Sequence, residues 1–158
     1  MGESEAGVAA QGVPLLVVDG ANVVGSVPDG WWRDRRGAAE RLRDGLAPVA
    51  DGGLVDGRSG VPDWARSGPL EVVLVVEGAA RGVTPTPQVR VETASGNGDD
   101  LIVELVAAAL AAHPGRACLV VTADRELRAR VTALGAEVTG PRTVRPDATD
   151  QKPGRPQP

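Results

Sequence analysis

Runs of apolar residues alternate with amphipathic segments along most of the chain. Three runs, at residues 13–19, 70–76 and 117–122, are apolar at almost every position, which is typical of strands buried on both faces of a parallel sheet. Residues 88–93 alternate between apolar and polar side chains and predict a strand nearer a sheet edge, and residues 137–139 predict a short last strand. The apolar pattern therefore predicts a sheet of mainly parallel strands.

Between these strands, apolar residues recur every three or four positions and predict helices at residues 34–47, 100–113 and 125–134. Residues 20–25 are rich in glycine and predict a turn. Residues 48–69 are rich in Gly, Pro and Asp and predict a long surface loop that is either disordered or functional. The order β-α-β-β-α-β-α-β predicts a three-layer α/β/α fold with a mainly parallel central sheet.

The chain has 158 residues, 42% of them hydrophobic, which is enough for one compact domain. We expect that domain at residues 13–141, with a flexible segment at 1–12 and a disordered Pro- and Arg-rich tail at 142–158. The first residues lack the basic and apolar regions of a secretion signal, no apolar run is long enough to span a membrane, and Cys118 is the single cysteine. These features predict a cytoplasmic protein without a membrane partner.

Charge narrows the classes of function. A net charge of −4 argues against a protein that holds nucleic acid on a broad basic surface, but it is compatible with an enzyme whose acids bind metal and whose arginines contact phosphate. The only lysine, Lys152, lies in the tail, which excludes a P-loop or Schiff-base mechanism in the domain. The single histidine, His113, ends a predicted helix and is expected to interact with the helix dipole rather than to take part in catalysis.

Acidic residues stand where apolar segments end or helices begin, at Asp19, Glu77, Asp99, Asp100 and Asp124. Because the carboxyl ends of parallel strands meet at one edge of a sheet, we expect these side chains to gather in a cleft. Gathered carboxylates repel one another and leave a negative potential unless a cation neutralises it. Oxygen ligands without nearby His or Cys favour Mg²⁺ or Mn²⁺ over zinc. The sequence therefore predicts a divalent-metal site.

Each acid also has a simpler structural interpretation. Asp19 could start a turn, Asp124 could cap the helix that follows it, and Glu77 could be a solvated loop residue. Of the adjacent pair, one is expected to cap its helix while Asp100, in preference to Asp99, faces the cleft as a ligand.

Arginines and tryptophans supply candidate substrate contacts. Arg125 and Arg128 follow Asp124 and are expected to contact phosphate. Trp32, together with Trp31 and the arginines around them, could stack on unpaired bases. The alternative is that one tryptophan packs under the first helix and that these arginines are solvated.

Three short motifs, in this order, carry a family resemblance: DGAN at 19–22, GDDLI at 98–102 and TADRE at 122–126. Over residues 13–141 they resemble PIN-like nuclease domains, more narrowly the NYN branch, and within it the bacterial YacP-like ribonucleases. The resemblance implies that Asp19, Asp100 and Asp124 bind Mg²⁺ or Mn²⁺. It also implies that Asn22 orients the first aspartate or the phosphate, with an Asx turn as the alternative role.

The chain departs from the family pattern at two places. YacP-like sequences tend to have an aspartate after the second strand, where this chain has Glu77. Many PIN domains use an acid on an intervening helix, and Glu40 is only a loose candidate because it is expected to pair with Arg36. These departures leave the number of metal ions, and activity itself, open.

The expected function is that of a metal-dependent endoribonuclease acting on single-stranded or structured RNA, with RNA, including ribosome-associated RNA, as the partner. A bound ion would activate water and stabilise the leaving oxygen. Two alternatives remain open: a metal-dependent nucleoside triphosphate hydrolase, and a PIN-like domain that binds RNA or a ribosome-associated partner without cutting. The sequence predicts neither the cleavage specificity nor the oligomeric state.

Overall fold

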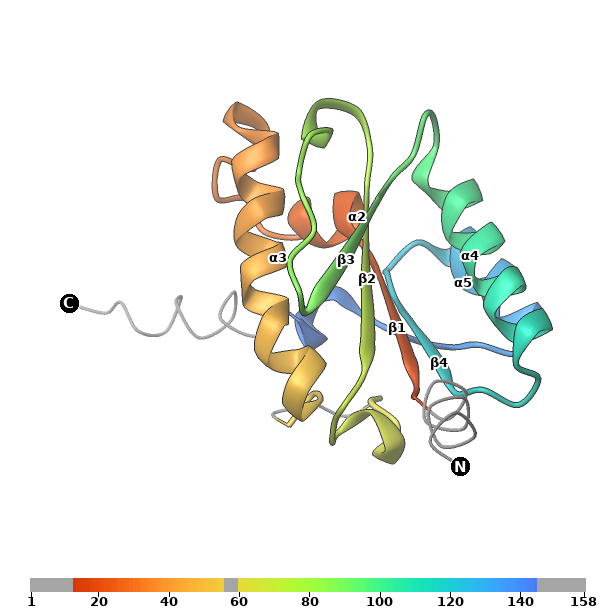
Figure 1. Ribbon diagram of the computed structural model, residues 1–158. Helices are drawn as coiled ribbons and strands as arrows, with labels where there is room; N and C mark the ends of the chain where they lie inside the picture. The colour runs from red at the N-terminus through yellow and green to blue at the C-terminus, as the bar shows by residue number, and fades with distance from the viewer. Residues whose placement is uncertain (1–12, 56–59, 145–158) are drawn as a thin grey trace.

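The computed structural model describes residues 13–55 and 60–144. Within them, five parallel strands form one sheet in the order β3-β2-β1-β4-β5 (Figure 1). The strands are β1 (Leu15–Asp19), β2 (Glu71–Val76), β3 (Val89–Thr93), β4 (Cys118–Val121) and β5 (Glu137–Thr139). The predicted α/β fold is confirmed, and the described sheet is parallel throughout.

Helices cover both faces of the sheet (Figure 1). They are α2 (Gly20–Val24) and α3 (Arg35–Gly52) on one face, and α4 (Gly98–Ala112) and α5 (Arg125–Ala133) on the other. Alternate residues of one strand serve the two layers: Leu16 and Val18 pack on the α3 side, whereas Leu15 and Val17 pack on the side of α4 and α5. Since both faces are buried, the strands need no polar positions, which explains their continuously apolar sequence.

The strand order reverses between β1 and β4. The chain passes from β1 outward to β2 and β3, and then crosses through α4 to the other side of β1, where β4 and β5 follow. In open parallel sheets, sites form at the carboxyl ends of the strands beside such a reversal. Asp19, the last residue of β1, meets Thr122, which follows β4, at this place.

The predicted turn after β1 is a short helix. Asp19 caps α2, because its side chain accepts a hydrogen bond from the Asn22 backbone N–H (3.3 Å). A Cβ added at Gly20 would lie 2.5 Å from the backbone oxygen of Val75. Only glycine therefore lets this helix start so close to β2.

The loop predicted at 48–69 begins later than expected, because α3 continues through Pro48. The apolar face of the helix extends to Ala50, which is buried, and this packing outweighs the local cost of the proline. After α3, Leu54 and Ala65 are buried in the core on the α3 side, and the segment contains the 3-10 helix η2 (Asp63–Ala65). Residues 56–59 lie outside the described residues, but the rest of the segment packs on the core in part.

The described chain continues past residue 141, the predicted end of the domain. The 3-10 helix η4 (Pro141–Thr143) follows β5, and Val144 packs against the core. The predicted flexible segment at 1–12 and the tail from residue 145 lie outside the described residues.

The remaining 3-10 helices are η1 (Trp31–Arg33) and η3 (Gly78–Ala80). None of the described helices combines the length and apolar character needed to cross a membrane.

Candidate functional site

Four carboxylates gather at the carboxyl ends of the strands, and we call them the acidic edge: Asp19, Glu77, Asp99 and Asp124. Asp19 ends β1, Glu77 follows β2, Asp99 lies in the first turn of α4, and Asp124 precedes α5. Burial is the main cause that raises the pKa of Asp99, and the charges of Asp124 and Glu77 raise it further. Side chains far apart in the sequence are therefore close enough to affect one another's ionisation.

Asp19 is the buried member of the acidic edge, with 5% of its surface exposed. The Thr122 hydroxyl donates a hydrogen bond to Asp19 Oδ2 (2.8 Å), and the Asn22 backbone N–H donates to Oδ1. Burial raises the pKa of Asp19 to about 6, although both hydrogen bonds act in the opposite direction. The charges of Asp99 and Glu77 add to the rise. A buried carboxylate in this environment favours a nearby cation.

Asn22 and Thr122 join the ends of β1 and β4. The Ala123 backbone N–H donates to Asn22 Oδ1 (2.9 Å), so the Asn22 side chain orients the segment that carries Asp124. Thr122 Oγ1, which donates to Asp19, also accepts from the Asp124 backbone N–H (3.1 Å). Thr122 is absent from the residues that the sequence predicts for the site. The feature of the sequence that could have indicated it is a hydroxyl residue at the end of an otherwise apolar strand.

Asp124 caps α5, because its Oδ1 accepts from the Leu127 backbone N–H (2.9 Å). Its Oδ2 makes no hydrogen bond with any described residue, so capping leaves one oxygen for the acidic edge. Of the two arginines predicted to contact phosphate, Arg128 uses its Nε to donate to the Thr122 carbonyl (2.8 Å). Arg125 is exposed and has neither an ion pair nor a hydrogen bond from its side chain within the described chain. Arg125 is therefore the better placed of the two to contact a substrate.

The adjacent aspartates differ from the prediction in two ways: neither caps α4, and Asp99 rather than Asp100 faces the acidic edge. Asn97 caps α4, since its Oδ1 accepts from the Asp99 backbone N–H (2.7 Å), so neither aspartate is the cap. Asp99 faces the acidic edge, whereas the Asp100 side chain is 66% exposed and pairs with Arg130 (3.1 Å). The physical reason is that Ile102 and Val106 define the buried face of α4. Asp99 lies three residues before Ile102, close to that face, whereas Asp100 is turned by about 100° from Asp99.

Glu77 links β2 to the start of α4. Its Oε2 accepts a hydrogen bond from the Gly98 backbone N–H (3.2 Å). A Cβ added at Gly98 would lie 2.7 Å from the same oxygen, so a larger residue at this position would displace the Glu77 carboxylate. Glu77 is therefore held in place by the helix rather than being a solvated loop residue. The other predicted acid, Glu40, is on α3 and pairs with Arg36 (3.3 Å), which confirms the expected pair.

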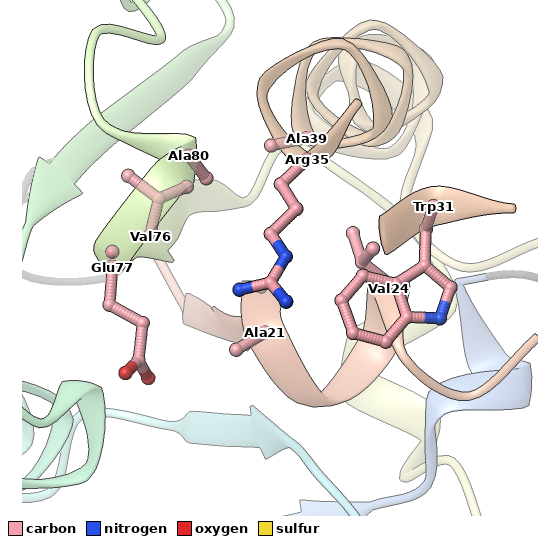
Figure 2. Close-up of a pocket in the computed structure, with 10 residues that line it drawn as sticks. Ala21, Val24, Trp31, Arg35, Ala39, Val76, Glu77 and Ala80 are labelled. Atoms are coloured by element: carbon pink, nitrogen blue, oxygen red, sulfur yellow. The ribbon is translucent and has the colours of Figure 1, made fainter. Parts of the chain in front are cut away.

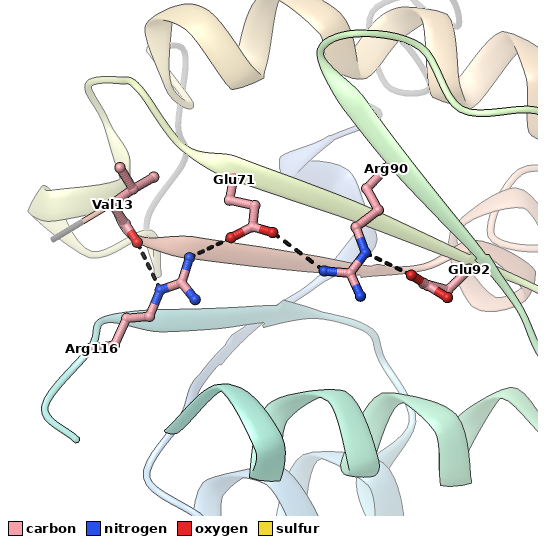
Figure 3. A network of polar contacts seen from close by, with 5 residues as sticks. All are labelled: Val13, Glu71, Arg90, Glu92 and Arg116. Carbon is pink, nitrogen blue, oxygen red and sulfur yellow. Dashed lines mark hydrogen bonds and ion pairs between the residues drawn. The ribbon is translucent and has the colours of Figure 1, made fainter. Parts of the chain in front are cut away.

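A different group of charges begins at the amino ends of β2 and β4 and continues along β3 (Figure 3), and we call it the charge network: Glu71, Arg90, Glu92 and Arg116. Glu71 begins β2 and pairs with Arg116 (2.6 Å), which precedes β4, and with Arg90 (3.4 Å) on β3. Arg90 also pairs with Glu92 (2.6 Å), and this hydrogen bond is the main cause that raises the pKa of Arg90. Arg116 Nε donates to the Val13 carbonyl (2.8 Å). Each carboxylate of the charge network therefore has a cationic partner.

A pocket of about 190 Å³ lies beside the acidic edge, on the α3 side of the sheet. Figure 2 shows the Arg35 guanidinium extending into it between Glu77 and Trp31. Trp31 packs partly against the core, in line with the alternative that one of the two tryptophans packs under a helix. Trp32 is 49% exposed. The two rings meet edge to face, with 6.0 Å between their centroids. Trp31, rather than the predicted Trp32, therefore lines the pocket.

The acidic edge suits a hard cation, but it is not a preformed cage. Within the described residues, no group of three or more His, Cys, Asp or Glu side chains is arranged to hold a metal ion directly. Mg²⁺ usually keeps several of its waters and binds through one or two carboxylates together with substrate phosphates. Burial is the main cause that raises the pKa values of Asp19 and Asp99, and the charges of neighbouring carboxylates add to both rises. The donor set therefore fits Mg²⁺ or Mn²⁺ bound partly through water.

No protein-family model matches the sequence, and no curated protein matches it significantly. Among solved structures, the crystal structure of Rae1 (YacP) from Bacillus subtilis superposes with a TM-score of 0.60 at 18% sequence identity, covering 90% of this chain and 77% of that chain. The chain has a YacP-like fold. A mutant of the same Bacillus subtilis Rae1 (YacP) gives a TM-score of 0.60 at 17% identity, with 90% of this chain and 79% of that chain covered.

The YacP-like fold agrees with the family that the three sequence motifs resemble. At this level of identity the likeness concerns the fold alone.

Proposed function

We propose that this protein is a PIN-like, NYN-type ribonuclease that hydrolyses internal phosphodiester bonds of RNA with the help of Mg²⁺ or Mn²⁺. The observation that carries the proposal is the acidic edge itself. Its four carboxylates converge where the strand order reverses, and none of them forms an ion pair with a described residue. An enzyme that must bind a cation and a phosphate needs such uncompensated charge.

Asp19, Asp99 and Asp124 would hold the ion, with Glu77 as a further acid that also fixes the start of α4. A bound ion of this kind lowers the pKa of water and stabilises charge on the phosphate oxygens. Thr122 orients Asp19, and Asn22 holds the segment before Asp124, so the carboxylates keep their relative positions. Arg125, exposed at the first position of α5, would bind a phosphate next to the one that is cut.

The net charge of −4 argues against a nucleic acid that is held along a broad basic surface, such as a long duplex. A short segment of RNA needs fewer contacts with its phosphates. The contacts with the backbone would be few and local, from single arginines beside the acids. Recognition would therefore depend on a short, accessible segment of the strand rather than on a long duplex.

The direct test is a cleavage assay with end-labelled RNA and Mn²⁺, in which the wild type, Asp124→Asn and a wild-type sample with EDTA are run side by side. Asparagine keeps the cap of α5, so the Asp124→Asn protein should fold normally and lose cleavage. Cleavage that persists in EDTA would contradict the metal requirement. Intact RNA in every lane, together with hydrolysis of free ATP, would favour the nucleoside triphosphate hydrolase. Intact RNA and intact ATP would favour a domain that binds without cutting.

A further inference from the structure

The pocket beside the acidic edge has a flat aromatic wall and a cation. Trp31 forms the wall, and the Arg35 guanidinium lies 5.3 Å from the centre of its ring. The floor is apolar, with Val24, Ala39 and Val76 among its lining residues (Figure 2). A planar, polarisable group is the ligand that such a surface attracts most strongly.

The charges around the pocket make the ligand more specific. Arg35 has no ion pair with any described residue, whereas its neighbour Arg36 pairs with Glu40. The Glu77 carboxylate at the mouth of the pocket can accept hydrogen bonds from the amino groups of a base. The volume of about 190 Å³ is below the roughly 300–1,000 Å³ of pockets that hold drug-sized ligands. The space therefore suits one ring system rather than a long ligand.

The pocket and the acidic edge share structural elements. Gly20, which follows Asp19, and Glu77 both line the pocket, and Glu77 also binds the start of the helix that carries Asp99. A ring held in the pocket would therefore place its attached backbone next to the acids. This juxtaposition connects recognition of a base with the position of the phosphate.

We propose that this pocket is a subsite for one unpaired nucleobase of the RNA strand, next to the phosphodiester bond that is cut. The inference rests on the proposed ribonuclease function and deepens it by naming single-stranded RNA as the substrate class. The base stacks on the Trp31 and Arg35 surface, and its edge meets Glu77. Stacking of this kind tolerates different bases, so the subsite selects accessible nucleotides more than a particular sequence.

The test measures binding in EDTA, where no cleavage is expected, by the fluorescence anisotropy of a labelled single-stranded oligoadenylate. An abasic oligomer of the same length reports backbone contacts alone. The wild type should bind the oligoadenylate more tightly than the abasic oligomer. Trp31→Ala and Arg35→Ala should each weaken binding of the oligoadenylate by about 5-fold to 150-fold and leave binding of the abasic oligomer unchanged. Trp31→Phe should restore much of the loss.

Two variants serve as matched controls. Arg36→Ala removes the same charge one position away, where it pairs with Glu40, and Trp64→Phe changes a tryptophan that instead hydrogen-bonds Glu137 (2.9 Å). Both should bind as the wild type does. Because Trp31 packs partly on the core, thermal melting must show that Trp31→Ala is folded, and the exposed Arg35→Ala tests the pocket in any case.

Equal binding of the two oligomers by the wild type, or an unchanged affinity in Arg35→Ala, would overturn the subsite. Displacement of the oligoadenylate by adenosine monophosphate at an equal concentration would also overturn it, because the pocket would then serve free nucleotides. A wild type that cuts RNA but does not distinguish the abasic oligomer retains the proposed function and loses the subsite. A wild type that distinguishes the oligomers but never cuts retains the subsite and loses the proposed function.

Discussion

Two regions of the central sheet, the charge network and the acidic edge, differ in how their acids are paired. In the charge network, Glu71 contacts both Arg116 and Arg90, and Glu92 contacts Arg90 (Figure 3). At the acidic edge, no carboxylate has an ion-pair partner within the described chain, and the pKa values of Asp19 and Asp99 are raised, mainly by burial. The protein contains 17 basic residues, so a shortage of arginines does not explain the difference. The paired acids of the charge network stabilise the fold, whereas the unpaired acids of the acidic edge are available to a ligand.

The distinction is clearest for glutamate, which occurs at both ends of β2. Glu71 at the start of the strand has two arginine partners. Glu77, directly after the strand, accepts a backbone hydrogen bond from Gly98 and keeps its charge uncompensated. The same residue type therefore has a structural role at one end and is available for chemistry at the other.

The largest expected effect separates the adjacent aspartates. Asp99→Asn should reduce RNA cleavage by about 100- to 1,000-fold, because it removes a carboxylate that faces the acidic edge. Asp100→Asn is the matched control: it changes an exposed acid that pairs with Arg130 and should reduce cleavage only slightly. Rates from end-labelled RNA in Mn²⁺ measure both. A larger loss in Asp100→Asn would show that Asp100, and not Asp99, serves the acidic edge.

The next effect is a pH dependence caused by Asp19. Its pKa rises from the usual 3.8 to about 6 in the folded protein, so the folded state binds this proton more tightly than the unfolded state does. The contribution to stability is therefore fully present below about pH 4, falls as the pH rises to about 6, and stays absent above that value. In EDTA, the contribution of Asp19 to the free energy of unfolding should fall by about 2–3 kcal/mol over this range.

The control is Asp19→Asn, which should flatten that part of the stability curve. Urea denaturation at several pH values measures it. If the stability of the wild type relative to Asp19→Asn rises from pH 4 to 6, Asp19 is stabilised in its charged form, and the contrast between the acidic edge and the charge network would then disappear.

The charge network should respond in stability rather than in cleavage. Arg116 is largely buried, with 8% of its side chain exposed, so Arg116→Ala removes hydrogen bonds to Glu71 and Val13 and should lower the free energy of unfolding by about 2 kcal/mol. Arg90→Ala affects a side chain that is 48% exposed and should cost under about 1 kcal/mol. Urea denaturation compares the two. Equal losses would indicate that burial of Arg116 does not matter.

The smallest effect is stabilisation by metal. At about ten times its dissociation constant, Mn²⁺ should stabilise the wild type by about 1 kcal/mol, because it binds the folded acidic edge. Asp99→Asn should show a smaller rise in melting temperature, whereas Arg116→Ala should show the same rise as the wild type. An unchanged melting temperature with Mg²⁺, Mn²⁺ and Ca²⁺ would count against a cation at the acidic edge.

Sequence patterns predict the strands and the edge of the sheet at which the acids gather, because both depend on the local order of residues. Continuous apolar runs indicate strands covered on both faces, and an acid at the end of such a run indicates the edge where it lies. The choice between Asp99 and Asp100 depends instead on how α4 is rotated against the sheet, which the buried Ile102 and Val106 set. The cap is also not visible in the apolar pattern, because Asn97 rather than either aspartate provides it.

Contacts between distant segments are the other part that the sequence leaves unpredicted. The hydrogen bonds from Thr122 to Asp19 and from Ala123 to Asn22 join residues that are 103 and 101 positions apart. No local pattern reports such a pair. Similarly, Pro48 predicts the end of a helix. The buried face of α3 continues past this proline, and its packing keeps the chain helical to Gly52.

The close approach at Gly20 has a consequence for how proteins of this shape diverge. A side chain at this position would collide with the backbone of β2, whatever the protein does. A related protein is therefore free to replace Asp99, but it cannot replace Gly20 without moving α2. Among proteins of this shape, Gly20 would be retained for the fold, whereas the aspartates beside it would vary with function.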